Sequence, residues 1–186
     1  MRYLIRMAQR NGPRDGFLSS IKAVAKSVGV DARNPKRTSY GALELDIFAP
    51  SKASMDTFLT ATEPLGRLES WRNLNVAPRY KTEEELFLEA RRYFNSERYW
   101  ECHEVLEGVW RLSSGDEKRH LQGIILVCAA FVHHQKGEDE VALSILRRAV
   151  KQLDFGAPRC NGIEVNSLRR RAESIISYGR FETFRI

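Results

Sequence analysis

The sequence contains little cysteine and no long apolar run. Its three cysteines, Cys102, Cys128 and Cys160, form no Cys-x-x-Cys pair, so neither a disulfide framework nor a structural zinc site is indicated. The longest apolar stretch, residues 123–132, is far shorter than the roughly 20 residues that a membrane span needs. The N-terminal stretch MRYLIRMAQR has no apolar signal core before its charges resume. These absences predict a soluble cytoplasmic protein with reduced thiols and no membrane partner.

The charge is distributed unevenly along the chain. The first 37 residues carry nine bases against two acids, a balance of +7, whereas the remaining 149 residues hold 21 bases and 22 acids. The net charge of +6 therefore comes entirely from the N-terminal end. Because a field of this sign attracts phosphates or anionic surfaces, nucleic acid or another polyanion is the partner that the basic N-terminal region indicates. An ordinary solvated surface is the alternative.

Residues 1–75 alternate between strand and helix patterns. Leu43, Leu45 and Ile47 alternate with polar residues, which is typical of a half-buried strand. The whole pattern predicts strands at 2–7, 32–36, 40–48 and 67–74, and helices at 16–28 and from Ser51 to Pro64. This β-α-β-β-α-β order predicts a ferredoxin-like domain, with one antiparallel sheet and both helices on one face. That topology hosts too many functions to indicate one of them.

Residues 76–186 are predicted to form a second, helical domain, which makes the whole chain an α+β protein. The segment 75–82, which contains Pro78, is the predicted linker. Thr82 and Glu85 form a capping box at the start of the first helix. Helices are predicted at 82–95, 97–111, 116–136, 139–153 and 165–178, with a loop at 156–162. Short connections make neighbouring helices antiparallel, so these helices form an up-and-down bundle.

The segment HEVLEGVW, which begins at His103, combines ionisable and aromatic residues on one helix. At 100° per residue, His103, Glu107 and Trp110 fall within about 60° of one another, and Glu104 lies on the flank. An unpaired buried charge is costly, so such groups become neutral, form pairs or bind metal. We therefore expect this helix face to meet polar atoms from another helix.

Counting outward from the turn near residues 114 and 115 places Gln122 opposite Glu107. This register predicts a hydrogen bond between Gln122 and Glu107, with His103 in the same buried cluster. His133 lies on the same face of its helix as Gln122 but about 10 Å from the level of His103. The two histidines are therefore not expected to share a ligand.

The cluster has three interpretations. The first is a satisfied polar network that fixes the register between helices. The second is a metal site on His103, Glu104 and Glu107, although zinc needs three well-placed ligands and dimetal bundles use Glu-x-x-His instead. The third is a metal-free acid–base site, with candidate residues His103, Glu104, Glu107, Gln122 and His133. No metal and no cofactor are predicted from this pattern.

Four segments carry a family resemblance, namely FNSERYWECHEVLEGVWR, LQGIILVCAAFVHHQKGE, ALSILRRAVKQL and GIEVNSL. Their sequence and spacing resemble those of the domain of unknown function 309 family over about residues 85–175. The resemblance implies a helical bundle and implies no activity. It also implies that His103, Glu104, Glu107, Trp110, Gln122 and His133 are the signature positions.

The sequence leaves three functions open and does not decide whether the protein is an enzyme. The leading prediction is a binding module with a buried His/Glu/Gln cluster, associated with nucleic acid. One alternative is an enzyme that acts on a small molecule through His103 and Glu107, by acid–base or metal chemistry. The other is a structural or partner-binding helical protein, for which a homodimer is the simplest partner.

Overall fold

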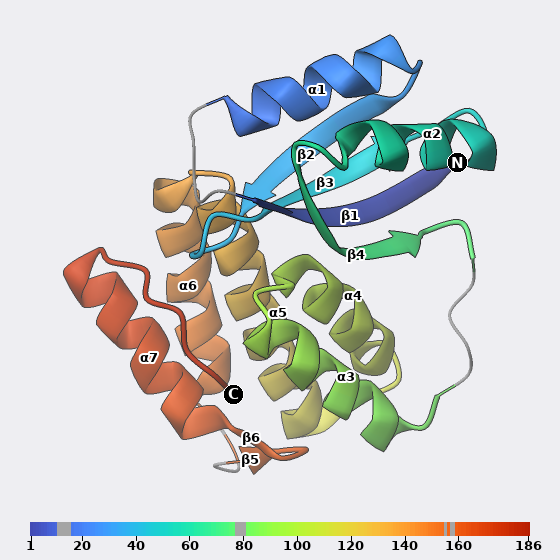
Figure 1. The fold of residues 1–186 in the computed structure, drawn as a ribbon. Coiled ribbons are helices and arrows are strands. Elements are labelled where there is room, and N and C mark those ends of the chain that lie inside the picture. Colours follow the sequence, from blue (N-terminus) through green and yellow to red (C-terminus); the bar gives the residue numbers. More distant parts are fainter. Residues whose placement is uncertain (11–15, 77–80, 155, 157–158) are drawn as a thin grey trace. The chain divides into compact units, whose positions relative to one another are not determined.

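The computed structural model describes residues 1–10, 16–76, 81–154, 156 and 159–186. The chain divides into two compact units, Met1–Arg79 and Tyr80–Ile186. The sequence predicted a linker at 75–82, and residues 77–80 of it lie outside the described residues. Figure 1 shows both units.

The described part of the N-terminal unit, residues 1–10 and 16–76, forms one antiparallel sheet and two helices. Its elements in chain order are β1 (Arg2–Gln9), α1 (Phe17–Ser27), β2 (Asp31–Arg37), β3 (Leu43–Phe48), α2 (Lys52–Thr62) and β4 (Gly66–Asn73). The strand order across the sheet is β2-β3-β1-β4, and all the strand pairs are antiparallel. The predicted order of strands and helices is confirmed. Figure 1 shows α1 and α2 on the same face of this sheet.

Strand alternation builds the core of this unit. Leu43, Leu45 and Ile47 of β3 are buried together with Phe17 of α1 and Phe58 of α2. The odd-numbered residues of β3 therefore face the helices, and the even-numbered residues face the opposite side. Ser51 caps α2 as its side chain accepts a hydrogen bond from the backbone N–H of Ser54 at 3.1 Å, so the predicted cap is confirmed.

The side of the sheet opposite the helices is charged. Arg2 Nη2 lies 2.8 Å from Asp46 Oδ2. The Glu44 carboxylate bridges two cations, with Arg6 Nη2 at 3.0 Å and Lys36 Nζ at 2.6 Å. Part of the positive charge counted in the sequence is therefore neutralised within the N-terminal unit.

An aromatic pair marks the edge strand β4. The ring of Trp71 lies 6.0 Å from that of Tyr3 on β1, centroid to centroid. Tyr3 is buried, whereas Trp71 is 52% exposed. The indole therefore covers the sheet edge on one side and contacts solvent on the other.

Over its described residues, 81–154, 156 and 159–186, the second unit contains five helices and one very short hairpin. Its helices are α3 (Glu83–Asn95), α4 (Tyr99–Trp110), α5 (Gly115–Gln135), α6 (Asp139–Leu153) and α7 (Val165–Tyr178). The five predicted helices are confirmed, each within a few residues of its predicted bounds. The predicted capping box is present too: Thr82 accepts from the N–H of Glu85, and Glu85 accepts from the N–H of Thr82.

The prediction of a purely helical second domain needs one correction. Two-residue strands, β5 (Arg159–Cys160) and β6 (Ile163–Glu164), pair antiparallel within or just after the predicted loop. Asn161 and Gly162 connect them with φ angles of 44° and 79°. An Asn-Gly pair with positive φ is typical of a two-residue hairpin turn, so the dipeptide itself was the signal that the periodicity analysis overlooked.

Aromatic and small residues shape the core of the bundle. Phe94, Tyr99 and Phe131 lie with ring centroids 4.7–6.0 Å apart. Gly123 of α5 faces Leu153 of α6, and a Cβ placed at Gly123 would lie 2.5 Å from Leu153 Cδ2. The close approach of α5 and α6 therefore requires glycine at this position.

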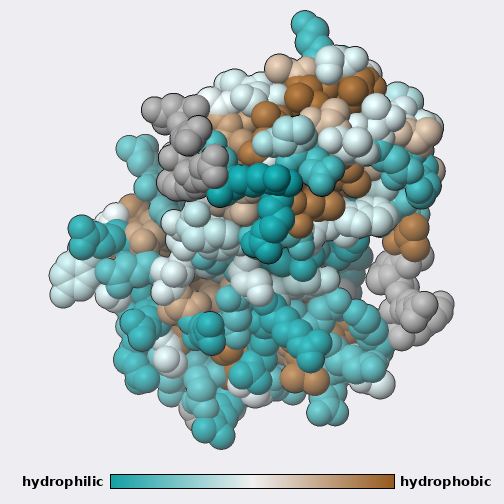
Figure 2. All heavy atoms as spheres, in the orientation of Figure 1, coloured by the Kyte–Doolittle hydropathy of each residue, from teal (hydrophilic) through white to brown (hydrophobic). Residues whose placement is uncertain are grey.

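The helices are amphipathic rather than apolar on all sides. Figure 2 shows hydrophilic residues over much of the visible face of the protein. Among the described residues, no helix combines the length and the apolar character that crossing a membrane would need.

Candidate functional site

Helix α4 places the candidate residues beside its buried stripe rather than on it. Tyr99, Cys102, Leu106 and Val109 are buried at helical spacing. The side chains of His103 and Glu107 are 25% and 38% exposed, and that of Glu104 is 45% exposed. The predicted buried cluster is therefore half-buried, because each candidate lies one or two positions along the helix from a core residue.

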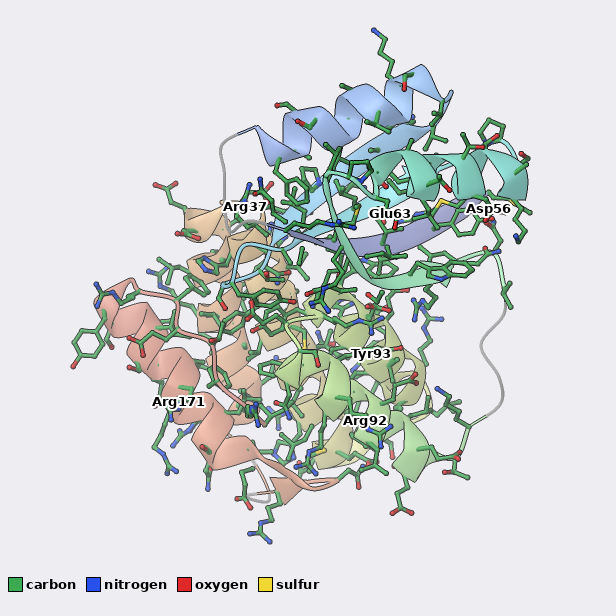
Figure 3. The ribbon with its side chains drawn as sticks, in the orientation of Figure 1. Arg37, Asp56, Glu63, Arg92, Tyr93 and Arg171 are labelled. Carbon is green, nitrogen blue, oxygen red and sulfur yellow. The ribbon has the colours of Figure 1, made fainter. Side chains whose placement is uncertain are left out.

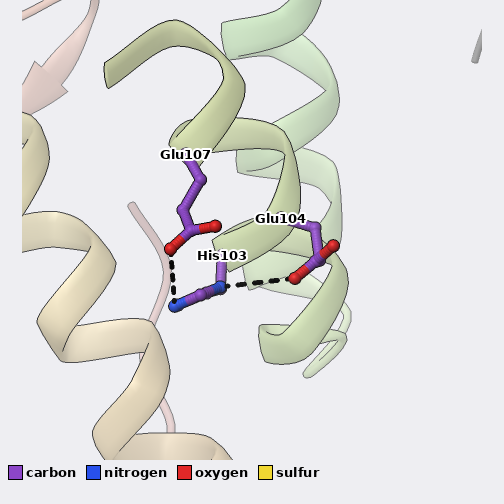
Figure 4. Close-up of side chains that lie close together, drawn as sticks. All are labelled: His103, Glu104 and Glu107. Atoms are coloured by element: carbon purple, nitrogen blue, oxygen red, sulfur yellow. Dashed lines mark ion pairs between the residues drawn. The ribbon is translucent and has the colours of Figure 1, made fainter. Parts of the chain in front are cut away.

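The three side chains nevertheless converge. His103 Nε2 lies 3.8 Å from Glu107 Oε1, and His103 Nδ1 lies 3.8 Å from Glu104 Oε1. Figure 4 shows the imidazole between the two carboxylates. One ligand atom from each of the three residues lies within 4.8 Å of the others. One turn of a single helix thus presents an imidazole and two carboxylates close together.

The polar atoms around this turn are incompletely satisfied. The 3.8 Å separations are longer than hydrogen bonds. His103 Nδ1 is buried and has no hydrogen-bond partner among the described residues, and the same holds for Trp110 Nε1. Glu107 also lies 3.7 Å from Arg111 Nη2. A buried nitrogen without a partner carries a desolvation cost that a bound ligand or water would relieve.

The predicted hydrogen bond between Gln122 and Glu107 is wrong. The described part of the chain contains no such bond, and Glu107 instead lies near His103 and Arg111. Gln122 is half-buried on α5, whereas its neighbours Leu121 and Gly123 are buried. The rotation of α5 about its own axis therefore places Gln122 at the side of the inner face rather than at its centre.

His133 belongs to a different local arrangement. Its Nδ1 lies 2.5 Å from Glu138 Oε2, at the turn that connects α5 to α6. The adjacent His134 makes the equivalent contact to Asp139 Oδ1 at 2.7 Å. His133 is half-buried rather than directed into the bundle, because its partner precedes α6 at the end of the helix pair. The group formed by His103, Glu104 and Glu107 does not include it.

Two close contacts on α4 were missed by the sequence analysis. Cys102 and Cys128 are fully buried, and their Sγ atoms lie 3.4 Å apart. Glu101 is buried and accepts two hydrogen bonds from the Arg98 guanidinium, at 2.5 and 2.6 Å. The i,i+3 spacing of Arg98 and Glu101 was a usable signal for the second contact. No local signal pairs two cysteines on different helices.

The fold and the site together define a class: an α+β protein whose helical unit carries a half-buried His/Glu cluster on one helix turn. Residues 87–145 match the family model described as Domain of unknown function (DUF309). The chain belongs to this family, as the resemblance implied. The matched segment includes all of the candidate residues from His103 to His133.

Two relatives illustrate how far the similarity extends. An uncharacterized protein of Aquifex aeolicus (strain VF5) is 25% identical over 95 residues. That match spans 50% of this chain and only 28% of the length of the relative. The crystal structure of a conserved hypothetical protein from Thermus thermophilus is 33% identical and covers 49% of this chain and 95% of its own, with a TM-score of 0.44. Neither protein carries a name that assigns an activity.

Proposed function

We propose that this protein is a binding module whose helical unit holds a divalent metal ion at His103, Glu104 and Glu107. The observation that carries the proposal is the convergence of these ligand atoms within 4.8 Å of one another, beside a buried His103 Nδ1 for which the described residues provide no hydrogen-bond partner. Imidazole and carboxylate are ligands that zinc and neighbouring transition metals accept. The carboxylates of Glu104 and Glu107 bring two formal negative charges to this cluster, and these attract cations.

A bound metal ion would draw the three ligand atoms of this site closer together. Ligand bonds of about 2.1 Å in a tetrahedron place the ligand atoms about 3.4 Å apart. The three ligand atoms, one from each residue, now lie within 4.8 Å of one another and would approach to that value through side-chain rotation. Three protein ligands from one helix turn also leave a coordination position open for water or another ligand, as in catalytic rather than structural zinc sites.

Cobalt titration tests the proposal directly, because tetrahedral Co²⁺ absorbs in the visible range. We expect one Co²⁺ per chain, displaced by Zn²⁺, and at least a tenfold loss of affinity in His103→Ala and in Glu107→Gln. His133→Ala is the matched control, since it removes another imidazole that faces a carboxylate in the same unit. Equal losses in His133→Ala and His103→Ala, or no stoichiometric binding by the native protein, would reject the site.

The other interpretations predict different results for the same variants. If the cluster only stabilises the fold, His103→Ala lowers the unfolding midpoint while the native protein binds no metal. If it is a metal-free acid–base site, Co²⁺ does not bind and a substrate screen with Glu107→Gln as the inactive control is the next test. If the protein is an enzyme that uses the bound metal, the Co²⁺ titration gives the expected result, and the reaction needs the open coordination position.

A second proposal concerns the partner of the N-terminal unit, for which we infer association with nucleic acid. Met1–Arg79 contains 13 bases and seven acids, a net charge of +6, whereas Tyr80–Ile186 contains 17 of each. The excess thus belongs to the α+β unit alone. A basic unit beside a neutral one attracts a polyanion to one part of the chain. A mobility-shift assay at two salt concentrations tests this association, and binding that does not weaken with salt would contradict it.

A further inference from the structure

The bases of the N-terminal segment fall into two groups in the structure. Arg2, Arg6, Arg33 and Lys36 form ion pairs with acids of their own unit. Among the described bases of residues 1–37, four exposed side chains form no ion pair that the structure shows: Arg10, Lys22, Lys26 and Arg37. A polyanion would gain most binding free energy at these four side chains, because at a paired base it must compete with the carboxylate partner.

Two of the four line an open depression. Lys22 and Lys26 lie one turn apart on α1, and the depression between this helix and the strand ends has a volume of about 950 Å³. Its other lining residues include Phe48 at the end of β3, Asp31 at the start of β2 and Pro50. Arg10 follows β1 and Arg37 is the last residue of β2, both at the opposite end of the sheet, where Figure 3 labels Arg37. The unpaired cations are thus separated into two places.

Where the depression reaches the end of β3, it is lined by Arg2 and Phe48, whose side chains lie on the side of the sheet opposite α1. Phe48 is half-buried, with the guanidinium carbon of Arg33 4.8 Å from its ring centroid and that of Arg2 5.6 Å away. Guanidinium planes and aromatic rings are the surfaces on which unstacked bases pack. The lysines supply charge for phosphates, so the depression offers both components that a single strand requires.

We propose that single-stranded nucleic acid binds in this depression, with its phosphates at Lys22 and Lys26 and a base against the Phe48 ring at the end of β3. This inference rests on the proposed nucleic-acid association and adds its location and strand type. Duplex nucleic acid presents phosphates but stacks its bases internally, and so would leave Phe48 unused. A lone phosphate would use the lysines alone. The combination of cations and an apolar ring therefore favours an unpaired strand.

The location is tested by two matched double variants of the full chain. Lys22→Gln/Lys26→Gln removes the unpaired charges at the depression, and Arg10→Gln/Arg37→Gln removes the same number at the other end of the sheet. Fluorescence anisotropy with a labelled 12-nucleotide mixed-sequence DNA strand follows binding between 50 and 200 mM salt. We expect the lysine variant to lose about tenfold in affinity, with a log–log salt slope smaller by about 1.4, since each single-strand phosphate contact contributes about 0.7. The arginine variant should bind nearly as the native protein does.

The outcomes separate the location from the association. Native protein that fails to bind the strand at 50 mM salt overturns both. Equal losses in the two double variants mean that overall charge attracts the strand, which overturns the location only. Phe48→Leu tests the strand type: we expect at least a threefold loss for the single strand and none for the corresponding duplex. Equal losses for strand and duplex, tighter binding of the duplex, or stronger binding to anionic lipid vesicles would each overturn the assignment.

Discussion

Cys102 on α4 and Cys128 on α5 place their Sγ atoms 3.4 Å apart at the fully buried contact between these helices. Burial, reinforced by the hydrogen bond and charge interaction with Cys102, raises the pKa of the Cys128 thiol well above its ordinary value. The third cysteine, Cys160, is also buried, and burial raises its pKa to about 11. The thiols of Cys102 and Cys128 therefore contact each other within the core of the helical unit, away from solvent.

We predict that none of the three thiols reacts readily in the native protein. Alkylation requires thiolate, and with a pKa of about 11 only roughly 0.1% of Cys160 is ionised at pH 8. Iodoacetamide labelling followed by mass spectrometry should therefore show little modification at pH 8, and three modified sites once urea unfolds the chain. Rapid native labelling of Cys102 or Cys128 would show that the α4–α5 contact opens often.

Alkaline pH should destabilise the helical unit. The unfolded Cys160 thiol ionises near its ordinary pKa of 9.0, whereas the folded thiol stays protonated up to about 11. The stabilisation associated with the protonated form is complete below pH 9 and is lost progressively between pH 9 and 11. The urea midpoint should fall over this range, and Cys160→Ala should reduce the fall. A midpoint that stays constant up to pH 11 would contradict the prediction.

Two helical glycines should respond oppositely to alanine. Gly123→Ala places a Cβ 2.5 Å from Leu153 Cδ2 and 2.7 Å from its Cγ, so repacking should cost about 1–3 kcal/mol. On α4, a Cβ at Gly108 would meet no described atom within 4 Å apart from the backbone of its own helix, so Gly108→Ala should stabilise the unit by about 0.5–1 kcal/mol through helix propensity. Urea denaturation measures the change in the free energy of unfolding for both variants. Stabilisation by Gly123→Ala as well as by Gly108→Ala would show that the α5–α6 contact is looser than these distances indicate.

Two arginine variants compare the contribution of a buried ion pair to stability with that of an exposed one. Arg6→Ala removes a partner of Glu44, and both side chains are at most 4% exposed. We expect it to destabilise the N-terminal unit by about 2–4 kcal/mol, since Lys36 still neutralises part of the carboxylate charge. Arg33→Ala breaks a pair whose side chains are more than half exposed, and should cost less than about 1 kcal/mol. Similar losses in both variants would contradict this ranking.

Limited trypsin digestion should cleave first between residues 75 and 82. Boundaries between compact units are usually the most accessible peptide segments, and the chain divides at Arg79 and Tyr80. We expect two protease-resistant fragments of about 79 and 107 residues, identified by mass spectrometry. Early cleavage within α4 or α5 would mean that the helical unit is the less stable part of the chain.

Much of the fold could be predicted because local rules agree with the tertiary structure. The alternation in β3 identified its core-facing residues, and the Thr82 and Ser51 caps fixed two helix starts. The short hairpin was not predicted because its strands have only two residues each, too few to show apolar alternation beside the Asn-Gly turn. Periodicity therefore located elements well, and turn chemistry would have completed the assignment.

The candidate site was less predictable for a geometric reason. The helical pattern predicted that Trp110 shares the inner face of α4 with His103 and Glu107, but its indole is half-buried and lies at the border of the core. The core stripe instead includes Cys102. This shift moved His103 and Glu107 from the core to its edge, and a similar rotation of α5 separated Gln122 from Glu107. Sequence periodicity gives the width of an apolar face, whereas packing decides its centre.

The position of Trp71 provides separate optical reporters for the two units. It is the only tryptophan in Met1–Arg79, and Trp100 and Trp110 both belong to the helical unit. Because the Trp71 indole is 52% exposed, its emission should be red-shifted and accessible to iodide, unlike that of the half-buried pair. Trp71→Phe would leave a protein whose fluorescence follows the helical unit alone, so that the loss of structure in each half can be observed independently within one intact chain.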